Sequence, residues 1–177
     1  MRRELTCPVL LSAAIVVMVL HYAGNLWATP PQGFVGTTIA LGRFGEIDIY
    51  NHSIPPSLRD EGHKSNMPLL WQQTKGSSDL YVQSNVWQPG GSTGWHTHPG
   101  HSLIIVTEGT VTGYEGDDPD CKPHVYTQGI GFVDPGGDHV HILRNESDVV
   151  AKAIAVQLIP SATARRIDVA DPGNCHF

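Results

Sequence analysis

The sequence predicts an all-β fold, either a sandwich or a barrel, made of many short strands. Runs rich in β-branched and aromatic residues recur along the chain, and turn residues separate them. The 177 residues include 19 Gly and 13 Pro, a composition typical of a chain with many turns. Only 16% of the residues are charged, which is too few for a disordered chain, and the length suits one domain.

The expected strands follow one another along most of the chain. β-Branched and aromatic residues suit a pleated surface, whereas Gly, Pro, Asn and Asp between the runs suit turns. Residues 52–78 show no clean period, so they are predicted to form a loop with one helical turn at most. Residues 149–156 fit a strand or a helix, but Val149, Val150 and the stop at Pro160 favour a strand. The expected strands are 37–44, 46–51, 79–87, 102–109, 110–116, 124–134, 139–146, 148–160 and 164–170.

The first 28 residues differ from the rest. Arg2 and Arg3 precede an apolar run at residues 9–20, and small or mixed residues follow up to Ala28. This is the layout of a cleaved secretory signal peptide, and the run is shorter than the ~20 residues that span a bilayer. We therefore expect export to the periplasm or the cell exterior, with no stable membrane span after cleavage. An uncleaved N-terminal membrane anchor is the alternative, because Leu26 fits the cleavage pattern poorly.

The remainder of the chain is predicted to be one domain. The net charge of -6, with scattered Lys and Arg, provides no basic stripe, so a nucleic-acid partner is not expected. The predicted order is a signal segment at 1–28, a linker at 29–36 and a β-barrel domain at 37–177, whose core lies at 78–160.

Two cysteines, Cys121 and Cys175, remain after cleavage of the signal segment. In an oxidising compartment a lone pair of cysteines is most simply a disulfide. Closing a loop of about 55 residues would stabilise the fold by ~4 kcal/mol on the chain-entropy model. The alternative is two unpaired thiols, one in a loop and one near the C-terminus.

Histidines cluster in the stretch "GWHTHPGHS", which contains His96, His98 and His101 and leads into an apolar strand. A neutral imidazole buried without a partner costs free energy, so packing alone does not favour such a cluster. Side chains at positions i and i+2 of a strand lie on one face, with Cα atoms roughly 6.6 Å apart, so His96 and His98 can converge on one atom. His139 and His141 repeat this spacing. Because neutral imidazole is the commonest ligand of divalent transition metals, the pattern predicts a metal site.

The first histidine pair lies in a spaced motif. Gly90 is followed by five residues, His96-Thr97-His98, three residues, Ser102, six residues and Gly109. This spacing resembles the first motif of the cupin superfamily, which has a Glu where this chain has Ser102.

The second pair lies in a spaced motif as well. Gly129 is followed by five residues and Pro135-Gly136-Gly137, and His141 and Asn145 come after, with three residues between them. This segment resembles the second cupin motif, with one extra residue between Gly137 and His141. The PGG turn needs a positive φ angle, which Gly adopts without steric cost. Asn145, near a turn, is predicted to bond the backbone and not a metal.

The resemblance covers residues 90–145 and implies a single cupin jelly-roll β-barrel. It also implies a metal site made by the motif histidines. A typical cupin site has three His and one Glu, and Ser102 is a poor ligand for a divalent metal. The implied ligands are therefore His96, His98 and His141.

Two further histidines remain open. His101 could occupy the missing position, although Pro99 and Gly100 leave its direction undetermined. His139 is the closest rival of His141, and it could be a ligand, a partner of a ligand or a proton shuttle. We expect His101 or His139 to supply a fourth contact at most.

Two functions fit these residues. The first is an exported metal-dependent enzyme with Fe, Mn, Ni, Cu or Zn, because three-His cupin sites occur among iron dioxygenases acting on thiols, diketones and aromatic diols. The second is a non-catalytic extracytoplasmic cupin that binds a metal or small ligand, since some cupins serve as storage or ligand-binding barrels. Trp87 and Trp95 are candidate pocket aromatics, or simply core. No acid–base pair stands out, so no catalytic residue is assigned. The expected partner is a small molecule, and a homodimer stays open.

Overall fold

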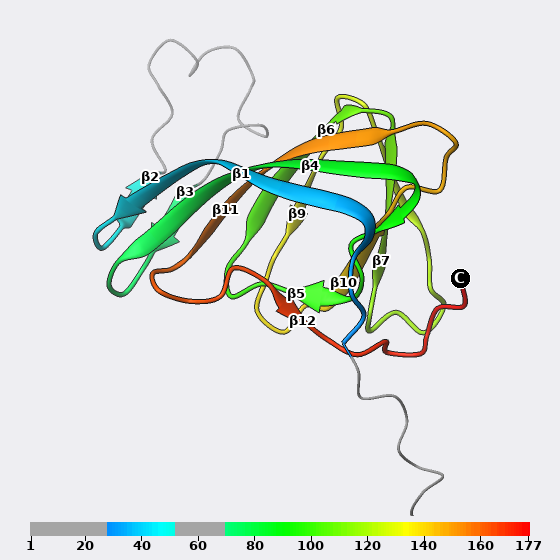
Figure 1. The fold of residues 1–177 in the computed structure, drawn as a ribbon. Coiled ribbons are helices and arrows are strands. Elements are labelled where there is room, and N and C mark those ends of the chain that lie inside the picture. Colours follow the sequence, from blue (N-terminus) through cyan, green and yellow to red (C-terminus); the bar gives the residue numbers. More distant parts are fainter. Residues whose placement is uncertain (1–27, 52–69) are drawn as a thin grey trace, which may run out of the picture.

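The protein is an antiparallel β-barrel, as the computed structural model shows for residues 28–51 and 70–177 (Figure 1). One layer follows the pairing order β1–β4–β11–β6–β9, and the other follows β12–β5–β10–β7–β8. A single pairing between β10 and β4 joins the two layers. The all-β barrel prediction is therefore confirmed. The strands are β1 (Gln32–Phe44), β2 (Asp48–Asn51), β3 (Leu70–Gln73), β4 (Ser78–Ser92), β5 (His96–Thr97), β6 (Ser102–Glu108), β7 (Thr110–Glu115), β8 (His124–Thr127), β9 (Gly131–Asp134), β10 (His141–Arg144), β11 (Ala151–Pro160) and β12 (Ile167–Asp168).

The first strand begins earlier than the sequence predicts. Strand β1 starts at Gln32, inside the predicted linker at 29–36, and pairs along almost all of β4. The ring of Phe34 lies 4.9 Å from that of Trp87, centroid to centroid, and packs against the core. The Pro- and Gly-rich composition indicated a linker. Pairing with β4 and the partial burial of Phe34 instead stabilise this segment as a strand.

Part of the predicted loop at 52–78 is also a strand. Residues 70–73 form β3, which pairs with β2 in a separate two-stranded sheet (Figure 1). The local sequence does not predict β3, because a strand of four residues is stabilised by its pairing with β2. Residues 52–69 lie outside the described part of the chain.

Two other boundaries differ from the prediction. The expected strand at 124–134 is divided into β8 and β9, because Gly129 adopts a φ of 85° in the turn between them. Strand β10 begins at His141, so His139 lies in the preceding turn and not on the strand. The ambiguous segment at 149–156 is a strand from Ala151 on, as predicted, and β11 ends at Pro160. Val149 and Val150, which favoured a strand, lie just before it.

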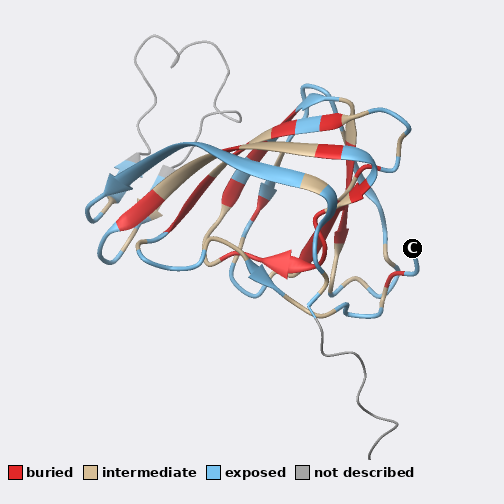
Figure 2. Ribbon diagram, viewed as in Figure 1, coloured by how far each residue is buried: buried red, intermediate tan, exposed pale blue. Residues whose placement is uncertain are grey.

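The core lies inside the barrel, where buried residues alternate with exposed ones along the strands (Figure 2). On β11, the inward side chains are small at Ala151, Ala153 and Ala155, which leaves room for the large Trp87 opposite. Trp87 is fully buried. The main cluster of buried apolar residues is Trp87, Ile104, Val106, Val111, Leu143, Ala151, Ala153 and Ala155.

A second cluster covers part of the other layer. It contains Trp95, Tyr114, Ile142 and Cys175, and the C-terminal Phe177 lies 4.9 Å from the Tyr114 ring. The sulfur atoms of Cys121 and Cys175 are at disulfide distance, and their Cα atoms are 5.3 Å apart, within the range of a normal bridge. The C-terminal tail is thus held against the barrel.

Asn145 is the buried backbone-bonding residue that the sequence predicts. Its Nδ2 donates to the carbonyl oxygens of Trp87, Gln88 and Val149, and its Oδ1 accepts from the amide of Ser147. Its side chain is fully buried, so no water can replace these contacts.

We expect Asn145→Ala to lower the free energy of unfolding by about 2–4 kcal/mol, because it leaves buried carbonyl groups without donors. Urea denaturation monitored by tryptophan fluorescence measures this change. The control Lys152→Ala removes an exposed side chain from β11 and should change stability by less than about 0.5 kcal/mol. Equal stability of the two variants would contradict the role given to Asn145.

Almost all of the predicted signal segment at 1–28 lies outside the described residues. Within the described part, no helix has the length and apolar character of a membrane span.

Candidate metal centre

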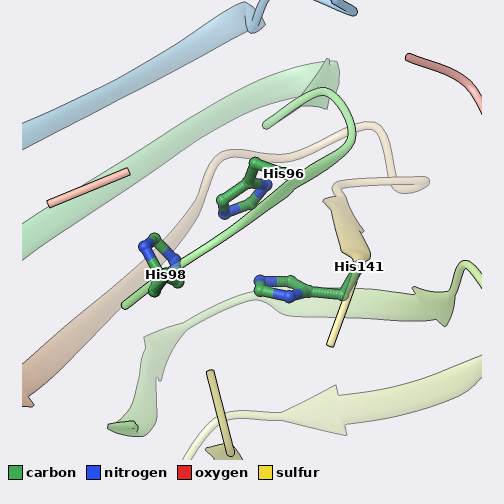
Figure 3. A group of neighbouring side chains, drawn as sticks. All are labelled: His96, His98 and His141. Carbon is green, nitrogen blue, oxygen red and sulfur yellow. The ribbon is translucent and has the colours of Figure 1, made fainter. Parts of the chain in front are cut away.

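Three histidines meet inside the barrel (Figure 3). His96 lies on β5 and pairs directly with His141, the first residue of β10, while His98 follows the end of β5. The centroid of the His96 ring lies 4.3 Å from that of the His141 ring and 4.8 Å from that of the His98 ring. The three side chains are 3–7% exposed, and one ring nitrogen of each lies within 4.8 Å of the others. The structure therefore brings together the three residues that the motifs predict as ligands.

The turn before His141 is attached to the segment that carries the first histidine pair. The Gly137 amide donates to the His98 carbonyl at 2.7 Å, and the Thr97 hydroxyl donates to the Gly137 carbonyl at 2.5 Å. Gly136 has a φ of 70°, and a Cβ at this position would overlap the carbonyl of Gly100. Glycine is thus required for the close approach of the two motifs.

The Nδ1 atom of each histidine faces a backbone carbonyl oxygen. The distances are 2.9 Å from His96 to Gly94, 2.7 Å from His98 to Arg165 and 3.5 Å from His141 to His139. Because a carbonyl oxygen only accepts, the proton of each neutral ring belongs on Nδ1, and the lone pair of Nε2 stays free. Such backbone contacts orient metal-binding imidazoles and select their tautomer.

Burial keeps these imidazoles neutral. It lowers the pKa of His96 well below the ordinary 6.5, and it also lowers the pKa of His98. Burial lowers the pKa of His141 to about 4. Near neutral pH, all three rings are therefore in the uncharged form that binds metals.

This arrangement predicts that the metal-free protein loses stability in acid. Between pH 6.5 and 4 the unfolded chain binds protons that the buried rings do not, so the free energy of unfolding falls as the pH falls. The depressed pKa of His141 alone corresponds to about 3 kcal/mol lost between pH 7 and pH 4. Urea denaturation in the presence of a chelator at several pH values measures this loss. Stability of the metal-free protein that does not change over this range would contradict it.

A buried carboxylate that the sequence reasoning missed adjoins the histidines. Asp134 is 4% exposed, and its Oδ2 lies 3.6 Å from Nε2 of His98. This separation is close to that of two ligand atoms on one ion, about 3–4 Å for metal–ligand distances of about 2.1 Å. Asp134 is paired with Ser102 across β9 and β6, and the Ser102 hydroxyl donates to it at 3.4 Å. A carboxylate thus lies beside the position where the cupin motif has its Glu.

No lysine or arginine in the described part of the chain pairs with Asp134. Its other contacts are the Gly136 amide at 2.9 Å and the Nδ1 atoms of His139 and His141 at 3.5 and 3.7 Å. A buried carboxylate beside neutral imidazoles is costly unless a cation lies nearby. The residues therefore fit a divalent cation.

His139 lies at the edge of the centre. Its Nε2 is 2.6 Å from Oε2 of Glu115, and its Nδ1 faces Asp134, so it connects the buried carboxylate with a half-buried one. Burial raises the pKa of Glu115, and the charge of His139 opposes that rise. His139 also groups with Asp134 and His141 as a second set of donors close enough to hold a metal.

The structure does not bring His101 to the centre. His101 lines a different cavity together with Trp71 and Leu158, and its carbonyl accepts from the Leu158 amide. Trp87 and Trp95 are both core residues, and only Trp87 also lines the cavity of the histidines.

That cavity is lined by both apolar and polar side chains. The cavity has a volume of about 40 Å³. Apolar walls come from Ile104, Leu143 and Ala155. Its polar lining is Gln83, Asn85, Thr93, His96, His98, Ser102, Asp134, His141, Gln157, Arg165 and Arg166.

Part of the chain is similar to known structures. An oxalate oxidase is 20% identical, with 46% of each chain covered and a TM-score of 0.39. Peruvianin-I, a cysteine peptidase from Thevetia peruviana latex, is 31% identical over 44% of this chain and 49% of that chain, with a TM-score of 0.38. A sugar phosphate isomerase of the cupin superfamily from Silicibacter pomeroyi is 24% identical over 46% and 51%, with a TM-score of 0.40. The aligned region spans about half of each of these structures. The comparison with curated proteins gave no match.

The family comparison agrees with the motifs and the barrel. The cupin domain family matches residues 85–157, a range that contains both motifs and the histidine cluster. Residues 85–157 thus form a cupin-type domain.

Proposed function

We propose that this cupin binds one divalent transition metal through Nε2 of His96, His98 and His141. One observation carries the proposal: three buried, neutral imidazoles converge while backbone carbonyls hold their Nδ1 atoms. Asp134 is the proposed fourth protein ligand, because its carboxylate adjoins His98 and pairs with no lysine or arginine in the described chain. The ion would be Fe, Mn, Ni, Cu or Zn, since imidazole and carboxylate ligands suit these metals.

We further propose that the metal serves a dioxygenase-like reaction on a small molecule. A bound divalent metal of this class polarises a coordinated oxygen and offers open positions to substrate and O2. The chain's own residues orient the ligands and exclude water, because Ile104, Leu143 and Ala155 form apolar walls beside the imidazoles. The alternative, a non-catalytic metal- or ligand-binding module, uses the same residues.

Export is part of the proposal. The N-terminal segment at 1–28 has a signal-peptide layout, and the disulfide-distance pair Cys121–Cys175 is compatible with an oxidising compartment outside the cytoplasm. A homodimer stays a prediction.

Metal uptake by variants of two aspartates tests the ligand set. We expect the wild type to retain one ion per chain after anaerobic loading with Fe(II), Mn(II) or Zn(II) and dialysis. Asp134→Asn should bind the same ion about tenfold more weakly, because it removes the charged ligand. Asp120→Asn, at an exposed aspartate, should bind as the wild type does. Elemental analysis gives the stoichiometry, and oxygen consumption by the Fe(II) form separates an enzyme from a binding module. A wild type that retains no metal would contradict the proposal.

A further inference from the structure

Three polar atoms inside the barrel have no hydrogen-bond partner in the described chain. They are Nε1 of Trp87, Oε1 of Gln83 and Oε1 of Gln157. Their side chains are 0–2% exposed, and all three line the cavity of the histidine cluster. Unpaired buried polar atoms are rare in native proteins. Three of them around one cavity indicate that bound molecules, water or a ligand, supply the missing partners.

The orientation of the Gln157 amide follows from its neighbours. The Asp134 carboxylate only accepts, so the Ser102 hydroxyl donates to it and accepts from Nε2 of Gln157 at 3.1 Å. Oε1 of Gln157 is therefore left as an acceptor that faces the cavity. Gln83 is similar, because its Nε2 donates to the Thr38 hydroxyl at 2.5 Å and its Oε1 stays free. Two buried acceptors of this kind fit a ligand with hydroxyl groups that donate.

A cation without an anionic partner lines the same cavity. Arg166 is already held, since its guanidinium lies 2.5 Å from the Asp168 carboxylate and donates to the Thr93 carbonyl at 2.6 Å. Arg165 is half-buried, and its guanidinium has no hydrogen bond or ion pair with the described residues. Its backbone carbonyl meanwhile holds the ring of His98. A partly buried guanidinium favours a bidentate carboxylate partner.

We propose that the barrel binds a small hydroxycarboxylate beside the histidine centre. Its carboxylate pairs with Arg165, its hydroxyl groups donate to Gln83 and Gln157, and its oxygens accept from the indole N–H of Trp87. One unmatched positive charge fits one carboxylate, and the two free amide oxygens fit a ligand with two hydroxyl groups. This inference rests on the proposed function in one respect, namely that the ligand lies next to the metal that would act on it.

The probes are D-glycerate, propionate, which lacks the hydroxyl groups, and glycerol, which lacks the carboxylate. Isothermal titration uses both metal-loaded, dialysed protein and metal-free protein, and elemental analysis before and after gives the metal content. We expect glycerate to bind at least about tenfold more tightly than propionate or glycerol. Arg165→Gln should weaken glycerate at least about tenfold at unchanged metal content. Gln157→Met should weaken glycerate but not propionate, which a general disturbance of the fold would not do.

Lys152→Gln is the matched control, because it removes one positive charge from an exposed site paired with Glu108. It should bind glycerate as the wild type does. Equal affinity for glycerate and glycerol, or unchanged glycerate binding by Arg165→Gln, overturns the inference while the metal content still reports on the proposed function. If the wild type takes up no metal but binds glycerate through Arg165, the proposed function fails and the hydroxycarboxylate site stands.

Discussion

Replacing His96, His98 or His141 by alanine, one at a time, is expected to weaken metal binding by at least about 100-fold. Each ring contributes one Nε2 to the proposed three-imidazole centre. Equilibrium dialysis followed by elemental analysis should therefore find close to one ion per chain in the wild type and almost none in each variant. Urea denaturation checks that each variant remains folded.

Two other histidines are the controls for this experiment. His139→Ala should weaken binding less, because His139 contacts Asp134 and Glu115 from the edge of the cluster. His124→Ala, at an exposed position on β8, should change nothing. If His141→Ala keeps its metal while His139→Ala loses it, the ligand assignment in the second motif is wrong.

Removal of the Cys121–Cys175 pair is expected to have the largest effect on stability. The two residues are 54 positions apart, and a bridge over such a loop stabilises a fold by about 4 kcal/mol on the chain-entropy model. The double variant Cys121→Ala/Cys175→Ala should therefore unfold at a much lower urea concentration than the oxidised wild type. Its metal stoichiometry should stay near one while it is folded, because neither cysteine lines the histidine cavity.

Reductant provides the matched control. It should lower the stability of the wild type to that of the double variant and have no effect on the double variant. Full alkylation of both thiols in unreduced, exported protein would show that no bridge forms, and the expected stabilisation would then be absent.

The sequence predicts the barrel and the three histidines because both depend on local patterns. The spacing of His96, His98 and His141 within the two motifs predicts that they lie together, and the structure brings them together. The stop at Pro160 likewise marks the end of β11. The bonding of Asn145 to the backbone likewise follows from its place near a turn.

The features that the sequence does not reveal depend on long-range pairing. Asp134 reaches the centre because β9 pairs with β6 so that Asp134 faces Ser102, and nothing local specifies that register. Its place directly before the PGG turn was the only available signal. Strand β3 and the first part of β1 are similar, because their partners β2 and β4 define them as strands. Arg165 lies beyond both motifs and reaches the cavity only through the return of the chain after β11.

The central claim is a metal ion bound between the three imidazoles. A crystal of the zinc- or cobalt-loaded protein, measured at the absorption edge of that metal, tests it most directly through the anomalous difference map. The account predicts one strong peak about 2.0–2.2 Å from Nε2 of His96, His98 and His141, with an oxygen of Asp134 in the same shell. A peak held instead by His139 and Glu115, or no peak inside the barrel, would contradict it.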